Sequence, residues 1–421
     1  MPLEHVPSSQ TDYHLMPFDA RGRERGGYSR EVLRLAASRP PTDVFVFSHG
    51  WNGDVPAARA QYGAWVATML RCPADLDRVS ARRGGFRPLL IGLHWPSKAW
   101  GDEELTAASF GVDEPGPSLD HLVDQFAARL DADPTVRAAV WTIVEAAQEH
   151  AAPRTLPENV RAAYHVVSLA DGTDAPEGDR EPFDPERMYQ ACLLEQAVSF
   201  GGLSIGGLLA PLRVLTFWHM KRRARLFGES GATKLVADLQ DAAPQARIHL
   251  MGHSFGAIVA AAAACGAHRP VDSLSLVQGA ISLWSFCSSI PNFPTRTGYF
   301  HRLIRESRVA GPVVVTTSPF DRAVGTFYPL GAWSGRQIDY VGPEELPRYG
   351  AIGTFGVRGP DVEVEDTSLE DTDELRAGVV HNLDARDVIA SGGGMSGAHN
   401  DICHPQVAHA VWTAVHATHK P

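Results

Sequence analysis

The segment GHSFG at residues 252–256 has the residue types and the spacing of a G-x-S-x-G nucleophile motif. In such a motif the serine lies on a sharp strand-to-helix turn, and small residues two positions before and after it let the two backbones pass closely. The preceding RIHLM is typical of a buried strand, and the following AIVAAAAAC is typical of a helix. Because the turn exposes the hydroxyl and directs a helix N-terminus toward developing negative charge, Ser254 is predicted to be a nucleophile.

A second G-x-S-x-G match, centred on Ser204 at residues 202–206, competes with this assignment. No strand of comparable quality precedes it, and Pro211 interrupts the sequence that follows. A motif of this kind depends on its structural context. We therefore interpret Ser204 as a small residue that allows close helix packing, and we expect Ser254 to be the reactive serine.

A serine nucleophile needs a general base, and that base needs an acid to orient it. Asp321 lies in the loop after the apolar run PVVVTT, and His399 lies in a Gly-rich loop before the last helical segment. The chain order Ser254, Asp321, His399 leaves room for strand–helix units between the three residues. We expect all three at one edge of a sheet, with Asp321 as the orienting acid and His399 as the base.

Neighbouring residues offer alternatives for the acid and the base. His404 competes with His399 as the base, and Asp401 is the second choice for the acid, although its expected role is to cap the final helix. Capping a helix is also the alternative role of Asp321. Cys403 beside His404 suggests a metal, but the spacing matches no strong zinc pattern, so no metal site is predicted.

The strand-like run DVFVFS ends in HGWNGD, which predicts how a developing oxyanion is bound. A His-Gly pair at this place lets the chain turn so that a backbone N–H points at the carbonyl oxygen. The two expected donors are the N–H groups of Trp51 and Phe255. Trp95 ends the next strand-like run, where core packing is its alternative role. The residues predicted to contact the substrate are His49, Gly50, Asn52, His253 and Trp95.

These residues need a sheet and helices that bring them to one edge. Six short apolar runs lack clean alternation, as expected of strands covered on both faces, and helical patterns lie between them. This alternation predicts class α/β, with a mostly parallel central sheet flanked by helices. The predicted strands are residues 43–48, 88–93, 247–251, 273–278, 312–317 and 385–390, with residues 13–17 as an added edge strand. The predicted helices are residues 29–38, 57–71, 226–239, 255–266, 298–306 and 405–416.

Two segments of the chain interrupt this pattern of alternating strands and helices. Residues 97–215 form a long, mainly helical insertion, which we interpret as a lid or cap, so the catalytic core is predicted to be residues 1–96 and 216–421. The second segment, residues 361–375, carries eight acidic side chains in fifteen positions and is expected to be a solvated loop or a small hairpin. The helices predicted within the insertion are residues 121–130, 135–150 and 158–170.

The composition limits the partners and the compartment. Lys and Arg number 38 and Asp and Glu number 49, which gives a net charge of −11 that repels nucleic acid and anionic membranes at long range. The first residues contain no apolar segment typical of a secretory signal, and the five scattered cysteines indicate reduced usage. We expect a cytoplasmic protein that binds no nucleic acid and needs no cofactor, with its oligomeric state left open.

An apolar, Gly-rich stretch at residues 197–212 bears on membrane contact. It is too weak for a transmembrane helix. One interpretation is a lid that lies in a membrane interface; the favoured one is a buried helix that lines the pocket, followed by a solvated basic turn. Membrane contact is therefore considered but not favoured. The basic residues of this turn are Lys221, Arg222, Arg223 and Arg225.

Four segments, SHGWNGD, GHSFG, SPFDRAVG and GAHNDI, together resemble the α/β-hydrolase superfamily, and more narrowly its bacterial serine esterase and lipase-like members. The resemblance covers residues 43–96 and 217–416. It implies the α/β-hydrolase fold and cleavage of a carboxylic ester by Ser254, His399 and Asp321 through an acyl-enzyme, without metal or cofactor. The insertion departs from the pattern, because it precedes the nucleophile-bearing strand, whereas many relatives place a cap after the sixth strand.

The expected substrate is a small-molecule or lipid ester. Two alternatives stay open, because the same triad can serve an acyltransferase or a peptidase, and a catalytically silent hydrolase fold can serve as an interaction module. Product analysis with an alcohol or amine acceptor separates the first alternative from ester hydrolysis. Labelling by a fluorophosphonate probe separates the second.

Overall fold

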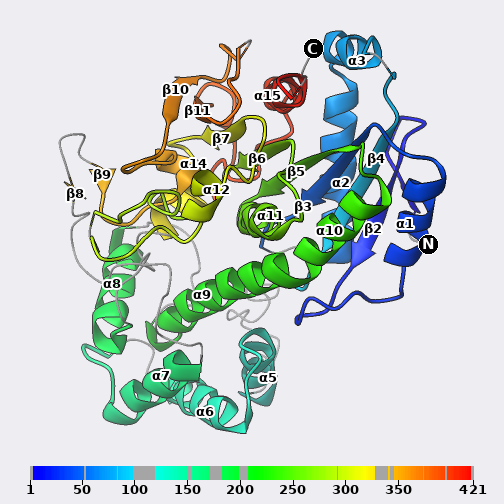
Figure 1. Ribbon diagram of the computed structural model, residues 1–421. Coiled ribbons are helices and arrows are strands. Elements are labelled where there is room, and N and C mark those ends of the chain that lie inside the picture. Colours follow the sequence, from blue (N-terminus) through cyan, green and yellow to red (C-terminus); the bar gives the residue numbers. More distant parts are fainter. Residues whose placement is uncertain are drawn as a thin grey trace. The chain divides into compact units, whose positions relative to one another are not determined.

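Within the described residues, nine strands form one sheet at the centre of the computed structural model (Figure 1). The strand order is β1-β2-β4-β3-β5-β6-β7-β11-β10, and neighbours run parallel except β1, which is antiparallel to β2. The class is therefore α/β, which confirms the prediction. The strands are β1 (Leu3–His5), β2 (Asp12–Pro17), β3 (Asp43–Ser48), β4 (Pro88–His94), β5 (Arg247–His253), β6 (Ser273–Val277), β7 (Val313–Thr317), β10 (Val364–Ser368) and β11 (Val380–Asp384). The structure describes residues 3–51, 54–82, 84–97, 119–149, 153–170, 183–198, 207–291, 293–327, 340–341, 346–372, 374–393 and 396–418.

Helices cover both faces of this sheet (Figure 1). Helices α2, α3 and α15 pack together on one face, whereas α1, α10 and α11 lie on the other. Helix α11 is apolar and buried along most of its length, because it lies against the central strands β3, β5 and β6. The helices of this part of the chain are α1 (Ser29–Ser38), α2 (Val55–Leu70), α3 (Pro73–Ser80), α10 (Thr233–Ala242), α11 (Phe255–Gly266), α12 (His301–Arg305), α14 (Ile352–Phe355) and α15 (Pro405–His416).

Aromatic side chains fill the core between β3 and the helices α2 and α15. The Phe47 ring centroid lies 6.1 Å from that of Trp65 in α2, and the Phe45 centroid lies 5.7 Å from that of Trp412 in α15. The indole N–H of Trp412 donates to the Met69 carbonyl at 3.0 Å, which satisfies its polar atom inside the core. Alternate residues of β3 thus hold both helices on one face of the sheet. The same packing fixes the ends of the loops that precede each helix.

The last strands of the sheet differ from the prediction. Residues 385–390 form a turn, and the strand is β11, immediately before them. Its sequence VHNLD looks polar, but Asn382 accepts from the Val357 N–H at 2.9 Å and donates to the Asp366 carboxylate at 2.9 Å, so its polar groups are satisfied inside the fold. The acidic residues 361–375 contribute β10, an edge strand of the main sheet, in place of a loop or hairpin.

Two other boundaries differ from the prediction. Residues 13–17 belong to β2, which lies one strand inside the edge because β1 pairs outside it. Residues 226–239 were expected to form one helix, and they span the end of α9 (Ala210–Phe227), a π-helical turn at Gly228–Ala232 and part of α10. A Cβ at Gly228 would lie 2.7 Å from the Cβ of Ala262, so the turn packs tightly on α11.

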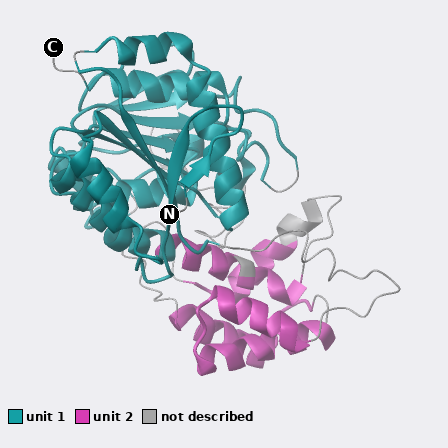
Figure 2. Ribbon diagram, turned by 90° about the vertical axis from the view of Figure 1, so that its right-hand side faces the viewer, with its two compact units in different colours: residues 1–97, 223–326, 350–421 teal, residues 98–222, 327–349 magenta. Residues whose placement is uncertain are grey.

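The chain divides into two compact units (Figure 2). The first holds the sheet, and the second comprises residues 98–222 and 327–349. In the second unit, α6 packs against both α5 and α7. Among the described helices, none is both long and apolar enough to cross a membrane. The first unit comprises residues 1–97, 223–326 and 350–421. The helices of the second are α5 (Leu119–Arg129), α6 (Pro134–Glu149), α7 (Glu158–Ala170) and α8 (Pro185–Val198), followed by most of α9.

The basic segment of α9 is helical and partly buried, which corrects the expectation of a solvated turn. Lys221 is 3% exposed, and its Nζ lies 4.9 Å from the centroid of the Trp218 ring. Arg223 is 7% exposed, and its guanidinium donates to the Pro96 carbonyl at 3.1 Å. These two charges are therefore engaged within the protein.

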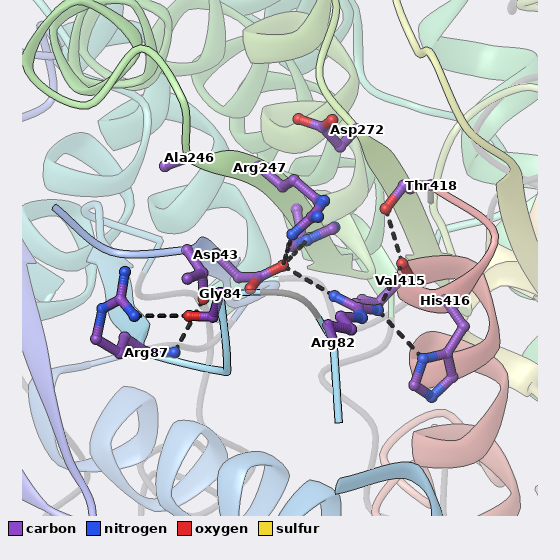
Figure 3. Close-up of polar contacts among 12 residues, drawn as sticks. Asp43, Arg82, Gly84, Arg87, Ala246, Arg247, Asp272, Val415, His416 and Thr418 are labelled. Atoms are coloured by element: carbon purple, nitrogen blue, oxygen red, sulfur yellow. Dashed lines mark hydrogen bonds and ion pairs between the residues drawn. The ribbon is translucent and has the colours of Figure 1, made fainter. Parts of the chain in front are cut away.

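A buried ionic cluster lies at the amino end of the sheet (Figure 3). The carboxylate of Asp43, the first residue of β3, pairs with Arg82 at 3.3 Å, with Arg247 at 3.5 Å and with the His249 ring at 3.2 Å. Burial raises the pKa of Asp43, but the interactions with His249, Thr42 and Arg247 together outweigh it and lower the pKa to about 2. Arg82 also donates to the His416 ring at 3.2 Å, so the cluster joins β3, β5 and α15.

Candidate active site

Ser254 lies at the carboxyl end of β5, on the turn between that strand and α11. Its φ of 56° and ψ of −121° lie in a region that non-glycine residues rarely adopt, so the turn is strained. A Cβ at Gly252 would lie 2.1 Å from the carbonyl oxygen of Gly256, and a Cβ at Gly256 would lie 2.1 Å from that of Ser48. Neither position has room for a side chain, which explains why the motif needs glycine two positions before and two positions after the serine.

Backbone contacts hold Ser254 in this conformation. Its N–H donates to the Val277 carbonyl at 3.1 Å, and its carbonyl accepts from the Ala280 N–H at 3.1 Å. Phe255 begins α11, so its N–H points out of the helix N-terminus. Within the part of the chain that the structure describes, the Ser254 hydroxyl makes no hydrogen bond to His399. Catalytic hydrogen bonds often tighten only when substrate binds.

Asp321 and His399 meet in a buried hydrogen bond. Asp321 follows β7 and is fully buried, and its Oδ2 lies 2.7 Å from Nδ1 of His399. Because an ionised carboxylate can only accept, Nδ1 carries the proton, and the lone pair of the ring lies on Nε2. The Ala398 N–H donates to the Phe320 carbonyl at 2.9 Å and ties the two loops together. The ring of His399 is thus held in the tautomer that a general base requires.

The alternative base and acid, His404 and Asp401, pair with each other. Nε2 of His404 lies 2.7 Å from Oδ1 of Asp401. Asp321 contacts His399 through Oδ2, and its Oδ1 accepts from the Val324 N–H at 3.1 Å. Asp321 therefore caps a turn and orients the ring of His399 at the same time, so its two interpretations are compatible.

Gln278, which sequence reasoning missed, also contacts the acid. It follows β6, is fully buried, and its Nε2 donates to Oδ2 of Asp321 at 2.9 Å. The two residues are 43 positions apart in the sequence. No local pattern marks a polar residue after a strand as a partner of a distant carboxylate. Asp321 Oδ2 thus accepts two hydrogen bonds, from Gln278 and from His399.

The loop after β3 passes directly beside Ser254. A Cβ at Gly50 would lie 2.6 Å from the Cβ of Ser254 and 3.1 Å from its Oγ, so the close approach depends on glycine. The ring centroid of Trp51 lies 5.9 Å from that of Phe255. The two expected oxyanion donors therefore come from segments that meet beside Ser254. Asn52, expected to contact substrate, lies outside the described residues.

His49 and Trp95, both expected to contact substrate, are fully buried behind this loop. The His49 ring stacks on Trp95 with centroids 5.6 Å apart, and the Trp95 indole donates to the His49 carbonyl at 3.2 Å. The His49 N–H donates to the hydroxyl of Tyr62, a residue that the sequence did not single out, at 2.8 Å. Burial lowers the pKa of His49 to about 3, so its ring is neutral. The contacts of both residues support the loop.

His253, the residue before Ser254, links two parts of the candidate site. Its Nε2 donates to the His399 carbonyl at 2.8 Å, and its Nδ1 accepts from the Gln61 amide of α2 at 3.0 Å. Burial lowers the pKa of His253 to about 3, and a neutral ring fits this pattern of one donor and one acceptor. Both ring nitrogens are engaged within the protein, so His253 helps to hold the loop that carries His399.

Ser204, the competing serine, lies outside the described residues. No family model matches the chain, and no curated protein or solved structure proves similar to it. The α/β architecture with its mostly parallel sheet is compatible with an α/β-hydrolase. A fold of this kind hosts many activities, so the function has to be argued from the site.

Proposed function

We propose that the protein is a serine hydrolase that cleaves carboxylic esters, with Ser254 as nucleophile, His399 as base and Asp321 as the acid that orients the base. The proposal is carried by the 2.7 Å contact between Nδ1 of His399 and Oδ2 of Asp321. This contact lies at the same edge of the sheet as the strained turn of Ser254. The order of strand, serine turn, acid loop and base loop supports an α/β-hydrolase fold of the esterase and lipase-like kind.

In the first half of the reaction, Oγ of Ser254 bonds to the ester carbonyl carbon while its proton passes to Nε2 of His399. The carbonyl oxygen becomes an oxyanion, which the N–H groups of Trp51 and Phe255 stabilise. The bond from carbon to the alcohol oxygen then breaks, and the alcohol leaves with the proton from His399. The products of this half are an acyl ester on Ser254 and a free alcohol.

In the second half, a water molecule gives a proton to Nε2 of His399 and attacks the acyl carbon. The same two N–H groups stabilise the second oxyanion. The bond to Oγ of Ser254 breaks, and the serine recovers its proton from His399. The steps consume only an ester and water, so the proposal includes no metal and no organic cofactor. The substrate is a small-molecule or lipid ester.

A fluorophosphonate probe and a panel of p-nitrophenyl esters test the proposal. The probe should label the wild-type protein at Ser254, and Ser254→Ala should lose labelling and on the order of 10⁶ in turnover while it stays folded. Ser204→Ala is the matched control, because it removes the serine of the other G-x-S-x-G match. Ser204→Ala should keep both the labelling and the turnover of the wild-type protein.

Three outcomes decide between the alternatives. Folded wild-type protein that neither takes the probe nor cleaves any ester would favour a silent interaction module. Loss of labelling in Ser204→Ala alone would move the nucleophile to the other motif. Faster transfer to an added alcohol or amine than to water would make the protein an acyltransferase with the same residues.

A further inference from the structure

Gln278 occupies an unusual backbone conformation beside the candidate site. Its φ is 44°, in the left-handed region that non-glycine residues seldom adopt and that is enriched at functional sites. Its N–H donates to Oγ1 of Thr316, on the neighbouring strand β7, at 3.0 Å. The side chain is fully buried. The fold therefore holds this glutamine in one place at some conformational cost.

The surrounding atoms determine which end of the Gln278 amide is nitrogen. One end faces Oδ2 of Asp321 at 2.9 Å and the Gly353 carbonyl at 3.1 Å, and both are acceptors, so this end must be the NH₂ group. The other end, Oε1, accepts from the Thr316 hydroxyl at 2.9 Å. A rotated amide would set its oxygen against two acceptors, so the orientation follows from the network.

We propose that Gln278 is a positioning residue for the proposed hydrolysis, because its amide fixes the Asp321 carboxylate in the orientation in which Oδ2 faces His399. Three donors define the plane of that carboxylate: His399 and Gln278 at Oδ2, and the Val324 N–H at Oδ1. A carboxylate fixed with Oδ2 toward the ring accepts from Nδ1 of His399, and Nε2 stays available to Ser254.

Burial makes the Gln278 donor hard to replace. Asp321 has no exposed surface, so water cannot take over a lost hydrogen bond, and a buried polar atom without a partner is destabilising. The His253 ring lies 4.7 Å from the His399 ring, but burial lowers the pKa of His253 to about 3, so it supplies no positive charge. Removal of the Gln278 amide should therefore change the state of the Asp321–His399 pair directly.

The test compares Gln278→Met with Gln240→Met. Gln240 is also a buried glutamine, 3% exposed, whose amide exchanges hydrogen bonds of 2.9 and 3.1 Å with the backbone of Arg269. It lies on α10, and Arg269 follows the end of α11 opposite Ser254. Both substitutions keep the side-chain length and remove a buried amide, so both should lower the thermal midpoint. We expect only Gln278→Met to lower kcat, by roughly 10–100-fold with KM unchanged, as for other partners that orient a ligand or base.

The second variant, Gln278→Glu, keeps the shape and tests the same donor through pH. Its carboxyl can donate to Asp321 while protonated, and it repels the Asp321 carboxylate once ionised. We expect kcat/KM of this variant, relative to wild type, to fall as pH rises. A ratio that stays constant with pH in folded protein would count against the positioning role. If Gln278→Met fails to fold, Gln278→Glu still tests the positioning role.

Nitrogen NMR of the His399 ring gives a readout that needs no substrate, with His399→Ala for assignment. We expect the proton on Nδ1 in wild type and in Gln240→Met, and a mixture of tautomers in Gln278→Met. The inference rests on the proposed function only for its kinetic part. If wild type cleaves no ester while the tautomer shifts in Gln278→Met, hydrolysis is refuted and the positioning of His399 stands. If Gln278→Met matches Gln240→Met in both tautomer and kcat, Gln278 is not a positioning residue.

Discussion

At the residue scale, the two oxygens of Asp321 serve different partners. Oδ1 accepts from the Val324 N–H and caps a turn, and Oδ2 accepts from His399 and Gln278. A carboxylate after a strand satisfies the sequence pattern of a cap and that of an orienting acid equally well. The three-dimensional contacts show that a single side chain meets both requirements, so capping is no argument against a role in the site.

We expect Asp321→Asn to lower kcat by roughly 10³–10⁴ in a protein that still folds. An amide has one oxygen and one NH₂ group. If the oxygen stays on the Val324 N–H, the NH₂ group faces His399, which must then accept at Nδ1 and carry its proton on Nε2, the wrong nitrogen for a base. Steady-state kinetics with a p-nitrophenyl ester and a thermal melt measure the two effects.

The matched control for this prediction is Asp401→Asn. Asp401 also pairs with a histidine, His404, at 2.7 Å, but that pair is separate from the pair of Asp321 and His399. We expect Asp401→Asn to keep kcat near the wild-type value. A full rate in Asp321→Asn together with a loss in Asp401→Asn would transfer the role of orienting acid to Asp401.

At the element scale, the loop before α15 sets the place of His399. Gly397 in this loop has a φ of 56°, and a Cβ there would lie 2.4 Å from the carbonyl oxygen of Phe320. The Ala398 N–H donates to that same carbonyl at 2.9 Å. Phe320 precedes Asp321, so the approach of the acid loop to the base loop depends on a glycine.

We expect Gly397→Ala to force these two loops apart and to lower kcat by on the order of 10², the loss associated with a displacement of about 1 Å at a reacting group. Gly393→Ala is the control in the same loop, because no atom of the described residues lies within 4 Å of a Cβ at Gly393. It should behave as wild type. The rate of fluorophosphonate labelling and kcat measure the effect, and equal rates in the two variants would show that the loops tolerate a wider spacing.

The strands β3 and β11 show where a strand can be predicted from the sequence and where it cannot. DVFVFS forms β3 at the expected bounds, because burial on both faces leaves an apolar run. VHNLD forms β11 although it contains three polar residues. The sequence predicts this strand at the following residues, 385–390. The partners that satisfy Asn382 lie 25 and 16 positions away in the sequence, and a pattern read along the chain does not contain them.

The candidate site likewise contains residues that could be predicted from the sequence and residues that could not. The strand-to-helix turn of Ser254 requires two nearby glycines, so its place after β5 could be predicted, and the loops of Asp321 and His399 follow strands in the expected order. Gln278 and Gln61 could not be predicted. Their contacts are with side chains 43 and 192 positions away, and glutamine occurs in many unrelated settings.

At the scale of the whole molecule, several histidines are buried in neutral form. Burial lowers the pKa of His49 and His253 to about 3, and burial followed by the charges of Arg78 and Arg82 lowers that of His416 to about 4. In the unfolded chain such rings titrate near ~6.5. The unfolded state therefore binds more protons between these values, so the stabilisation is present at higher pH and is lost as pH falls through the folded pKa.

We expect the free energy of unfolding to fall as pH drops below ~6.5, with each such histidine contributing about 1 kcal/mol per pH unit near pH ~5. His416→Gln should reduce this slope by about one such contribution. His268→Gln is the matched control, because it removes a histidine that is exposed and pairs with Asp241 at the surface. Urea unfolding across this pH range measures the slopes. An unaltered slope in His416→Gln would mean that its ring is protonated in the folded protein.

The centre of the sheet joins parts of the chain that are synthesised at different times. Strands β3 and β5 are neighbours, yet Asp43 and Arg247 at their starts are 204 positions apart. A ribosome that adds 5–20 residues per second needs roughly 10–40 s to cover that distance. During this interval the nascent chain carries β3 as an open edge with a largely apolar surface, which is the kind of surface that aggregates. The long separation of β3 and β5 along the chain thus has a cost during translation, because the candidate site cannot begin to assemble until its later half has left the exit tunnel.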